Sequence, residues 1–503
     1  MSRIRSAKFQ SKVMSAEDAA TFINNGDNVG VAGFTGAGYP KALPGALADR
    51  IKAAHARGDE FQIGLYTGAS TAPELDGVLA ETGGLSYRVP YQSDPIMRDA
   101  INKGLCDYND IHLSHLGPQI REGFLGRMNV AIVEVTSITK HDHLVPSSSM
   151  GNNNVYLETA DKIILEVNSW QSEDLEGMHD IFDDVVPRPH QKPLPLRAPG
   201  DRIGRTTFVV DPDRVVAVVE TDSADRNTPF KPLDDESKAI AGNFIDFLAN
   251  EVKQGRLPAD GLHPLQSGVG NIANAVLAGL LDSDLENLTS YTEVIQDGMV
   301  DLIDAGKLKV ASATAFSLSP EYAERMNNEA AKYRKSIILR PQEISNNPEI
   351  IRRLGVVSCN GLIEADIYGN VNSTHIMGSK MQNGIGGSGD FTRNAYISCF
   401  VTPSVAKNGD ISCIVPMVSH HDHTEHDVMV IITEQGVADL RRLSPRKRAR
   451  VIIEKCAHPD FRPALLDYLE RAEKTANGLH TPHDLREALS WHVRMLETGT
   501  MKQ

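Results

Sequence analysis

A single glutamate stands where the chain changes from a strand pattern to a helix pattern. Glu293 follows the short apolar run Leu288–Tyr291, and the apolar residues Val294, Met299 and Leu302 then recur with a helical period. A strand end that feeds a helix is a common place for an active-site residue in α/β proteins. A glutamate there can act as a nucleophile that forms a covalent intermediate with an activated acyl group. Glu293 is therefore the candidate nucleophile.

Other acids compete with Glu293 when spacing alone is considered. Asp297 lies one helical turn farther on, Glu364 sits in a strand-like run, and Glu434 ends another such run. Asp297 also fits a simple surface acid. The residues alone favour Glu293 by its position and leave these alternatives open.

Two glycine-rich segments suit close approach of a ligand to the main chain. Residues 384–390 are the most glycine-dense, and a strand-like run at residues 395–401 follows them, which favours a functional loop over a flexible surface loop. Residues 33–38 form a glycine turn between a strand and a helix. They lack the full dinucleotide-binding spacing, which disfavours a nucleotide cofactor of that kind.

Two histidine-rich segments, residues 141–143 and 420–426, could suggest a metal site. A zinc site needs a complete set of three or four ligands, and neither segment has an obvious group that completes one. A polar or hydrogen-bonded loop is the favoured interpretation, and we expect no metal.

The chain is long enough for two domains, and its second half repeats the pattern of the first. It has 503 residues, and a strand, a glycine turn and a helix occur at residues 28–57 and again at 265–281. Gly68 and Glu293 each follow a Tyr-Thr pair, and Glu134 and Glu364 match in nearly the same register. These matches indicate a diverged duplication in which only one copy carries the acid, with the active site between the domains. A polar stretch before a predicted helix at residues 236–254 places the boundary between domains 1–230 and 231–503.

Composition narrows the class of protein. The chain is 41% hydrophobic and 23% charged, with a net charge of −15, which opposes nucleic-acid binding. No apolar run approaches the roughly 20 residues of a membrane span, and the basic start lacks a signal-peptide core. Five cysteines without a CxxC pair predict reduced, buried thiols in a cytoplasmic protein, although one catalytic cysteine stays an alternative.

These motifs together resemble the acetyl-CoA hydrolase/transferase family of class I CoA-transferases over nearly the whole chain, and within it the succinyl-CoA:acetate type. No single glycine motif would be specific, but the set is. The stretches that carry the resemblance are residues 33–40, 266–271, 291–298, 361–374, 377–391 and 433–440.

The resemblance implies an α/β fold of two similar α/β/α (NagB/RpiA-like) CoA-transferase domains, with Glu293 as the nucleophile. It also implies an oxyanion-stabilising pair formed by Asn346 and the Gly387 N–H, a substrate-carboxylate arginine at Arg226, and a supporting acid at Glu434. The CoA-binding positions that it implies are Gly268, Val269, Gly270, Asn271, Ile272, Ile363, Asn383, Gly387 and Lys407.

The activity implied by the resemblance is transfer of CoA between succinyl-CoA and acetate by ping-pong covalent catalysis. The alternatives are an acetyl-CoA hydrolase and a propionyl-CoA:succinate CoA-transferase. The resemblance implies acyl-CoA and small carboxylates as ligands, no cofactor beyond the substrate coenzyme A, and a homodimer. Nucleic-acid and membrane partners are not expected.

Overall fold

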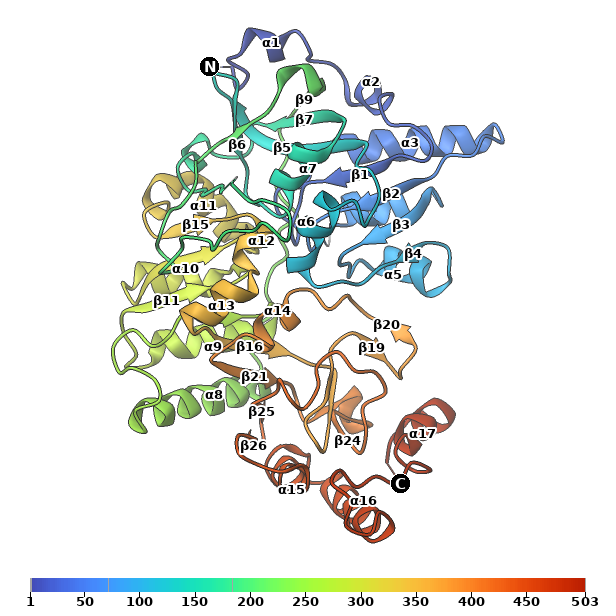
Figure 1. The fold of residues 1–503 in the computed structure, drawn as a ribbon, viewed down its shortest axis with the longest axis vertical. Coiled ribbons are helices and arrows are strands. Elements are labelled where there is room, and N and C mark those ends of the chain that lie inside the picture. Colours follow the sequence, from blue (N-terminus) through green and yellow to red (C-terminus); the bar gives the residue numbers. More distant parts are fainter. Residues whose placement is uncertain (1, 71, 183, 503) are drawn as a thin grey trace. The chain divides into compact units, whose positions relative to one another are not determined.

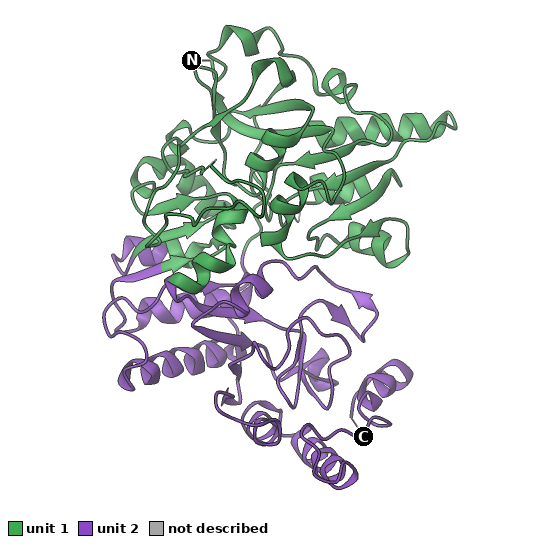
Figure 2. Ribbon diagram, in the orientation of Figure 1, with its two compact units in different colours: residues 1–229, 290–300, 309–353 green, residues 230–289, 301–308, 354–503 purple. Residues whose placement is uncertain are grey.

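The computed structural model describes residues 2–70, 72–182 and 184–502 and has an α/β architecture in which helices cover sheets rich in parallel strands (Figure 1). The predicted α/β class is confirmed. The chain packs into two compact units, coloured separately in Figure 2. Unit 1 comprises residues 1–229, 290–300 and 309–353, and unit 2 comprises residues 230–289, 301–308 and 354–503. This division follows packing and does not test a domain boundary at residue 230, which stays a prediction.

Unit 1 is built on a mainly parallel sheet whose strands run in the order β4-β3-β2-β1-β5-β6-β8, with β7 beside β5 and β9 beside β7. Within the described part of this sheet, the antiparallel pairs are β5–β6 and β6–β8. The strands are β1 (Asn28–Val31), β2 (Ile63–Tyr66), β3 (Leu85–Val89), β4 (Asp107–Tyr108), β5 (Val130–Ile138), β6 (His143–Pro146), β7 (Lys162–Asn168), β8 (Phe208–Val209) and β9 (Val215–Thr221).

Short and medium helices connect these strands, and α3 is the longest of them. The helices before residue 229 are α1 (Ala7–Gln10), α2 (Ala16–Ala20), α3 (Leu43–Ala56), η1 (Pro73–Gly77), α4 (Val78–Ala80), α5 (Pro95–Asn102), α6 (Leu113–Arg121), α7 (Asn153–Thr159), η2 (Glu173–Leu175) and η3 (Pro212–Arg214). Leu47 and Ile51 of α3 pack on Val29 and Ile63 of the sheet, which closes one face of the core.

The middle of the chain carries the candidate nucleophile on short elements. They are β11 (Leu288–Tyr291), β12 (Val294–Ile295), α10 (Asp297–Asp304), β13 (Leu308–Ala313), β14 (Ala315–Phe316), α11 (Pro320–Tyr333), β15 (Ile337–Leu339), α12 (Gln342–Ser345) and α13 (Pro348–Leu354). β13 pairs with β15, and β12 with β14, both in parallel.

Unit 2 contains a second parallel run of strands, β10-β16-β21-β25, closed by the antiparallel strand β26. Its elements are α8 (Asp235–Lys253), β10 (Leu265–Ser267), α9 (Asn271–Asp282), β16 (Val357–Gly361), β17 (Glu364–Asp366), β18 (Val371–Asn372), β19 (His375–Ile376), β20 (Lys380–Met381), α14 (Ser388–Thr392), β21 (Ile397–Val401), β22 (Val405–Ala406), η4 (Lys407–Gly409), β23 (Ile411–Ser412), β24 (Ile414–Val415), β25 (Val430–Thr433), β26 (Gly436–Asp439), α15 (Pro445–Cys456), α16 (Arg462–Thr475) and α17 (Ser490–Thr498).

Two details of the sequence interpretation were wrong. The helical pattern after Glu293 does not start a helix at once, because Val294 and Ile295 form β12 and α10 begins only at Asp297. Glu134 and Glu364 are not equivalent either. Glu134 lies in β5 of the main sheet, whereas Glu364 lies in β17 of a separate three-stranded sheet.

None of the described helices is both long enough and apolar enough to cross a membrane.

A buried ion pair ties β3 of the unit 1 sheet to the helical turn η1. The Arg88 guanidinium donates to the Asp76 carboxylate at 2.9 Å, and Ser70 donates to the same carboxylate at 2.6 Å. Both charged side chains have 0% exposure. Burial raises the pKa of Asp76, although Arg88 and Ser70 oppose that shift.

We expect Arg88→Met to destabilise unit 1, because removing one partner leaves a buried charge without compensation. The loss should be about 3–5 kcal/mol and lower the midpoint of thermal unfolding by about 5–15 °C. The control is Lys103→Met, which breaks the exposed Lys103–Asp99 pair and should cost less than about 1 kcal/mol. Equal shifts in the two variants, measured by differential scanning calorimetry, would contradict this account.

Candidate active site

The main chain of Glu293 is fixed at the point where two parallel strand pairs meet. Its carbonyl oxygen accepts hydrogen bonds from the N–H groups of Thr314 at 2.8 Å and Ala315 at 3.2 Å. On one side, the Thr292 N–H donates to the Ser312 carbonyl at 2.9 Å, and on the other side β12 pairs with β14. The backbone therefore holds Glu293 from both directions, while its side chain stays partly exposed.

The Glu293 carboxylate has a buried amide donor. The Asn346 Nδ2 donates to Glu293 Oε1 at 3.1 Å, and Asn346 itself has 0% exposure. The Ser345 hydroxyl lies 2.9 Å from Asn346 Oδ1, and donating to that oxygen leaves the amide N–H groups facing the carboxylate. The structure thus brings together two of the three residues predicted to be catalytic.

Asn346 follows α12, and α12 is anchored on neighbouring segments of unit 1. The Gln342 N–H donates to the Gly151 carbonyl at 2.8 Å, and its side-chain amide donates to the Leu113 carbonyl at 2.8 Å. Glu343 forms a buried ion pair with Arg121 of α6. These contacts hold the amide in place before any ligand arrives.

Apolar side chains flank the carboxylate. Phe34, Ala69, Leu113, Val294 and Ala315 form a buried cluster, and Tyr91 packs against it. Burial raises the pKa of Tyr91, and the nearby Glu293 carboxylate raises it further. The phenol therefore stays neutral, and the apolar cluster lies next to the partly exposed Glu293 in the chain.

The position matching Glu293 in the first half of the chain cannot hold a side chain. Gly68 follows β2 as Glu293 follows β11, each two residues after the tyrosine that ends the strand. A Cβ on Gly68 would lie 2.6 Å from the Gly33 carbonyl oxygen and 3.0 Å from the Phe34 ring. Packing therefore explains why this position carries no acid.

Arg226 lies on the loop after β9, with a fixed main chain and a largely exposed side chain. Its N–H donates to the Gly36 carbonyl at 2.8 Å. Its guanidinium is 53% exposed and pairs with the half-exposed Glu74 carboxylate at 3.0 Å. An exposed pair of this kind contributes little, on the order of 0–1 kcal/mol, so a carboxylate ligand can replace Glu74.

In unit 2, a cavity of about 310 Å³ opens where parallel strands end. β10 runs into the loop 268–270, β16 ends at Gly361, and β21 ends at Val401, and these ends line it. Ligands of open α/β sheets commonly bind at such an edge. Gly268, Val269, Gly270, Asn271 and Ile272, which we predicted to bind CoA, all line this cavity.

The charged side chains that line this cavity are acidic. Among its described lining residues, Asp234 and Glu236 are the only charged ones. Burial raises the pKa of Glu236, and the charges of Glu434 and Asp234 add to that effect. The predicted supporting acid Glu434 follows β25, and accepts from the Ser404 N–H at 2.8 Å and from the Ser404 hydroxyl.

The remaining predicted CoA contacts lie on loops of unit 2. Asn383 donates to the carbonyls of Ser373 at 3.1 Å and Gly384 at 2.9 Å, which shapes the glycine-dense loop. Gly387 is buried and is the N-cap of α14. Ile363 is half-buried, and Lys407 is exposed on the turn between β22 and β23.

The alternative nucleophiles and metal ligands considered from the sequence lie in surroundings that favour a structural role. Glu364 is buried and bonded to Ser419, Asn372 and His492. Burial raises the pKa of Cys359 to about 12, which disfavours a thiolate nucleophile. Across residues 2–70, 72–182 and 184–502, no three His, Cys, Asp or Glu side chains gather as a metal site would require.

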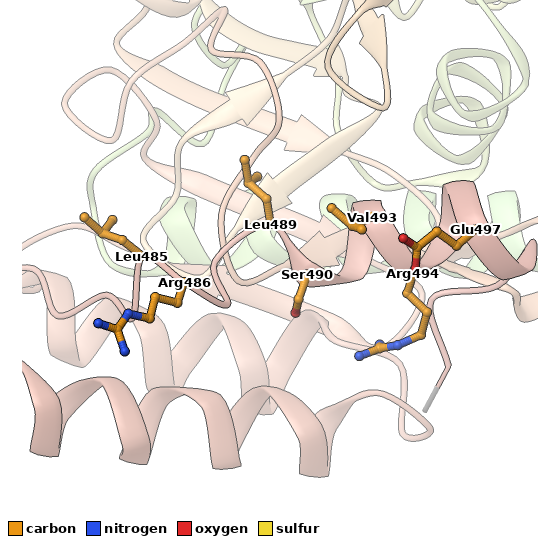
Figure 3. A pocket seen from close by; sticks show the side chains of 7 residues that line it. All are labelled: Leu485, Arg486, Leu489, Ser490, Val493, Arg494 and Glu497. Atoms are coloured by element: carbon orange, nitrogen blue, oxygen red, sulfur yellow. The ribbon is translucent and has the colours of Figure 1, made fainter.

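A second cavity, of about 370 Å³, lies along the last helix of unit 2 (Figure 3). It contains none of the predicted site residues, so it is not the candidate active site. Its lining comes from α17 and the turn before it: Leu485, Arg486, Leu489, Ser490, Val493, Arg494 and Glu497.

Sequence reasoning missed the residues that hold the site together. Ser345, Gln342 and the polar loop at residues 147–154 carry no local motif. Ser345 and Gln342 contact Asn346 from the turn just before it, whereas the loop contacts the β13–β14 turn from far along the chain. Met150 and Gly151, for example, donate to the Thr314 carbonyl and hydroxyl. Only the unusual density of serine and asparagine in residues 147–154 could have pointed to this loop.

Comparison with known proteins identifies the family. The model of the acetyl-CoA hydrolase/transferase N-terminal domain matches residues 1–220, and that of the C-terminal domain matches residues 323–469. The chain belongs to the acetyl-CoA hydrolase/transferase family. It is an enzyme of this family.

Relatives in this family carry several activities in their names. The chain is 51% identical to the succinyl-CoA:acetate CoA-transferase of Clostridium kluyveri, over 99% of this chain and 92% of that protein. It is 45% identical to the acetyl-CoA hydrolase of Candida glabrata, over 99% and 97%. It is 43% identical to the propanoyl-CoA:succinate CoA transferase of Escherichia coli, over 97% and 98%.

Solved structures share the fold. RipA from Yersinia pestis matches with a TM-score of 0.71 and 25% identity, covering 94% of this chain and 99% of that one. A 4-hydroxybutyrate CoA-transferase from Porphyromonas gingivalis matches with a TM-score of 0.63 and 22% identity, covering 92% and 98%.

Removing the amide donor should slow this family member without weakening acyl-CoA binding. We expect Asn346→Ala to lower kcat for acetyl-CoA by about 10²–10³ with little change in KM, because the amide acts mainly on charge that develops in the transition state. The control is Asn347→Ala. Its side-chain oxygen accepts from Glu349 at 3.0 Å at the start of α13, so it should lose about 1 kcal/mol of stability and keep kcat. Steady-state kinetics that show equal kcat in Asn346→Ala and the wild type would contradict the assignment.

Proposed function

We propose that this enzyme transfers CoA between succinyl-CoA and acetate, with Glu293 as the nucleophile. The observation that carries the proposal is the 3.1 Å hydrogen bond from the buried Asn346 amide to the Glu293 carboxylate. Relatives named as transferases and as hydrolases both fit this family, so the choice of transfer rests on chemistry and on the experiment below.

The first half-reaction forms a covalent enzyme. The Glu293 carboxylate attacks the thioester carbonyl carbon, the carbon–sulfur bond breaks, and CoA thiolate leaves a mixed anhydride on Glu293. The thiolate then attacks the glutamyl carbonyl, and the donor acid departs as its carboxylate. A glutamyl-CoA thioester remains, and the acceptor acid runs the same steps in reverse.

A carboxylate is a weak nucleophile, so the tetrahedral oxyanions need donors that are already oriented. We assign this role to the Asn346 amide, and the family resemblance adds the Gly387 N–H as a second donor. One such donor contributes on the order of 10²–10³ in rate. The fixed main chain of Glu293 and the anchored α12 keep the reorganisation small.

The unit 2 cavity suits the neutral part of CoA. It carries two acidic side chains and offers main-chain N–H groups at the start of α9. Amides of the pantetheine arm fit such a lining, whereas phosphates would meet Asp234 and Glu236. The exposed Lys407 is better suited to the phosphates, and we assign Ile363 and Asn383 to other parts of CoA.

Arg226 is assigned to the second carboxylate of succinate. A guanidinium can bind a carboxylate through two parallel hydrogen bonds. Succinate has a second carboxylate for this contact, whereas the one carboxylate of acetate is the group that reacts. The proposed chemistry uses no metal and no cofactor beyond the substrate coenzyme A. A homodimer and a cytoplasmic location stay predictions.

Acceptor dependence separates transfer from hydrolysis. We expect the release of CoA from acetyl-CoA to be slow in buffer, and succinyl-CoA to form at least about tenfold faster when succinate is added, since the covalent intermediates are shielded from water. Product analysis by liquid chromatography measures both rates. Acetyl-CoA consumption at the same rate with and without succinate would show a hydrolase, and faster transfer from propionyl-CoA would show the propionyl type.

A further inference from the structure

A buried lysine outside the reacting groups is fully occupied by hydrogen bonds. The Lys41 ammonium donates to the Tyr39 carbonyl at 2.7 Å, to Glu134 at 2.6 Å and to Asp225 at 2.8 Å. Its side chain is 6% exposed. Burial would lower the pKa of Lys41, but the two carboxylates outweigh it and raise that pKa. The lysine is therefore a fixed cation rather than a proton carrier.

Asp225 connects Lys41 to the glycine turn after β1 through hydrogen bonds. One of its oxygens accepts from Lys41 and from the Gly38 N–H at 2.9 Å. The other accepts from the Ser148 hydroxyl and from the Gln171 amide at 3.1 Å. All of these atoms are buried, so each bond acts in a medium that screens charge poorly.

Arg226 follows Asp225 in the chain, and its main chain contacts the same glycine turn. The Arg226 N–H donates to the Gly36 carbonyl at 2.8 Å. A Cβ on Gly36 would overlap the Arg226 carbonyl oxygen, so only glycine permits this approach. Among the described residues, the half-exposed Glu74 is the ion-pair partner of the guanidinium.

The turn is also tied to the segment that carries the nucleophile. The Thr35 hydroxyl donates to the Phe316 carbonyl at 2.9 Å, and Phe316 belongs to β14, the partner of β12. Phe34 packs in the same apolar cluster as Val294, the neighbour of Glu293. One turn therefore connects the position of the Arg226 backbone to that of Glu293.

We propose that Lys41 and Asp225 are positioning residues that fix Arg226 at a set distance from Glu293 and so determine selectivity for acceptors with a second carboxylate. The proposal rests on the proposed function, in which Arg226 receives that carboxylate. Neither Lys41 nor Asp225 touches the substrate; both act through the turn at residues 36–38.

The test compares two acceptors with one donor. With acetyl-CoA as donor, Lys41→Met should lower kcat/KM for succinate by about tenfold or more, mainly through KM, and change kcat/KM for propionate less than about threefold. In an Arg226→Met background, Lys41→Met should change the succinate value less than about threefold further, because the two residues act as one unit.

Gly36→Ala tests the same coupling without disturbing the buried charges, and it serves if Lys41→Met does not fold. Its methyl group displaces the Arg226 carbonyl, so we expect the same loss confined to succinate. Equal losses for succinate and propionate, or full additivity with Arg226→Met, would overturn the proposal. A wild-type enzyme without acceptor-dependent turnover would contradict the proposed function itself. An Arg226→Met variant that loses both acceptors equally would contradict Arg226 as the carboxylate receptor.

Discussion

The proposed chemistry depends on the hydrogen bond between the Asn346 amide and the Glu293 carboxylate. A carboxylate reacts slowly with a thioester unless donors are already aimed at the charge that develops. Contacts with neighbouring segments therefore hold both Glu293 and Asn346 in position. Two N–H groups hold the Glu293 carbonyl, and α12 is anchored through Gln342 and Glu343. The Asn346 side chain is fully buried, so it donates from a medium that screens charge poorly.

Each unit places its chemistry at the carboxyl ends of parallel strands. In unit 1, the turn after β1, Gly68 after β2 and Asp225 after β9 lie there. In unit 2, the ends of β10, β16 and β21 line the cavity assigned to the pantetheine arm. A shared architecture thus carries different roles. The crowded site at Gly68 has no room for an acid, whereas the position after β11 accommodates one.

Much of this could be predicted from local patterns, and the failures have a common physical cause. The strand before Glu293, the glycine turns and the helices α8 and α9 follow from periodicity and turn residues, and α8 and α9 begin within two residues of the expected positions. The short strand β12 was not predicted, because the spacing of its apolar residues is also helical. Val294 and Ile295 form a strand through their pairing with β14. Glu364 resembled Glu134 in a short match, yet tertiary packing puts it in another sheet. Lys41 and residues 147–154 act through partners distant in sequence, which no local motif reveals.

The central claim is that Glu293 becomes covalently attached to the acyl group and then to CoA. The most direct measurement is mass spectrometry of the enzyme incubated with acetyl-CoA and treated with borohydride, which reduces a glutamyl-CoA thioester to an alcohol. The account predicts a mass change confined to the peptide that contains Glu293, dependent on acetyl-CoA and absent in Glu293→Ala. An unmodified Glu293 peptide in an enzyme that turns over under the same conditions would contradict it.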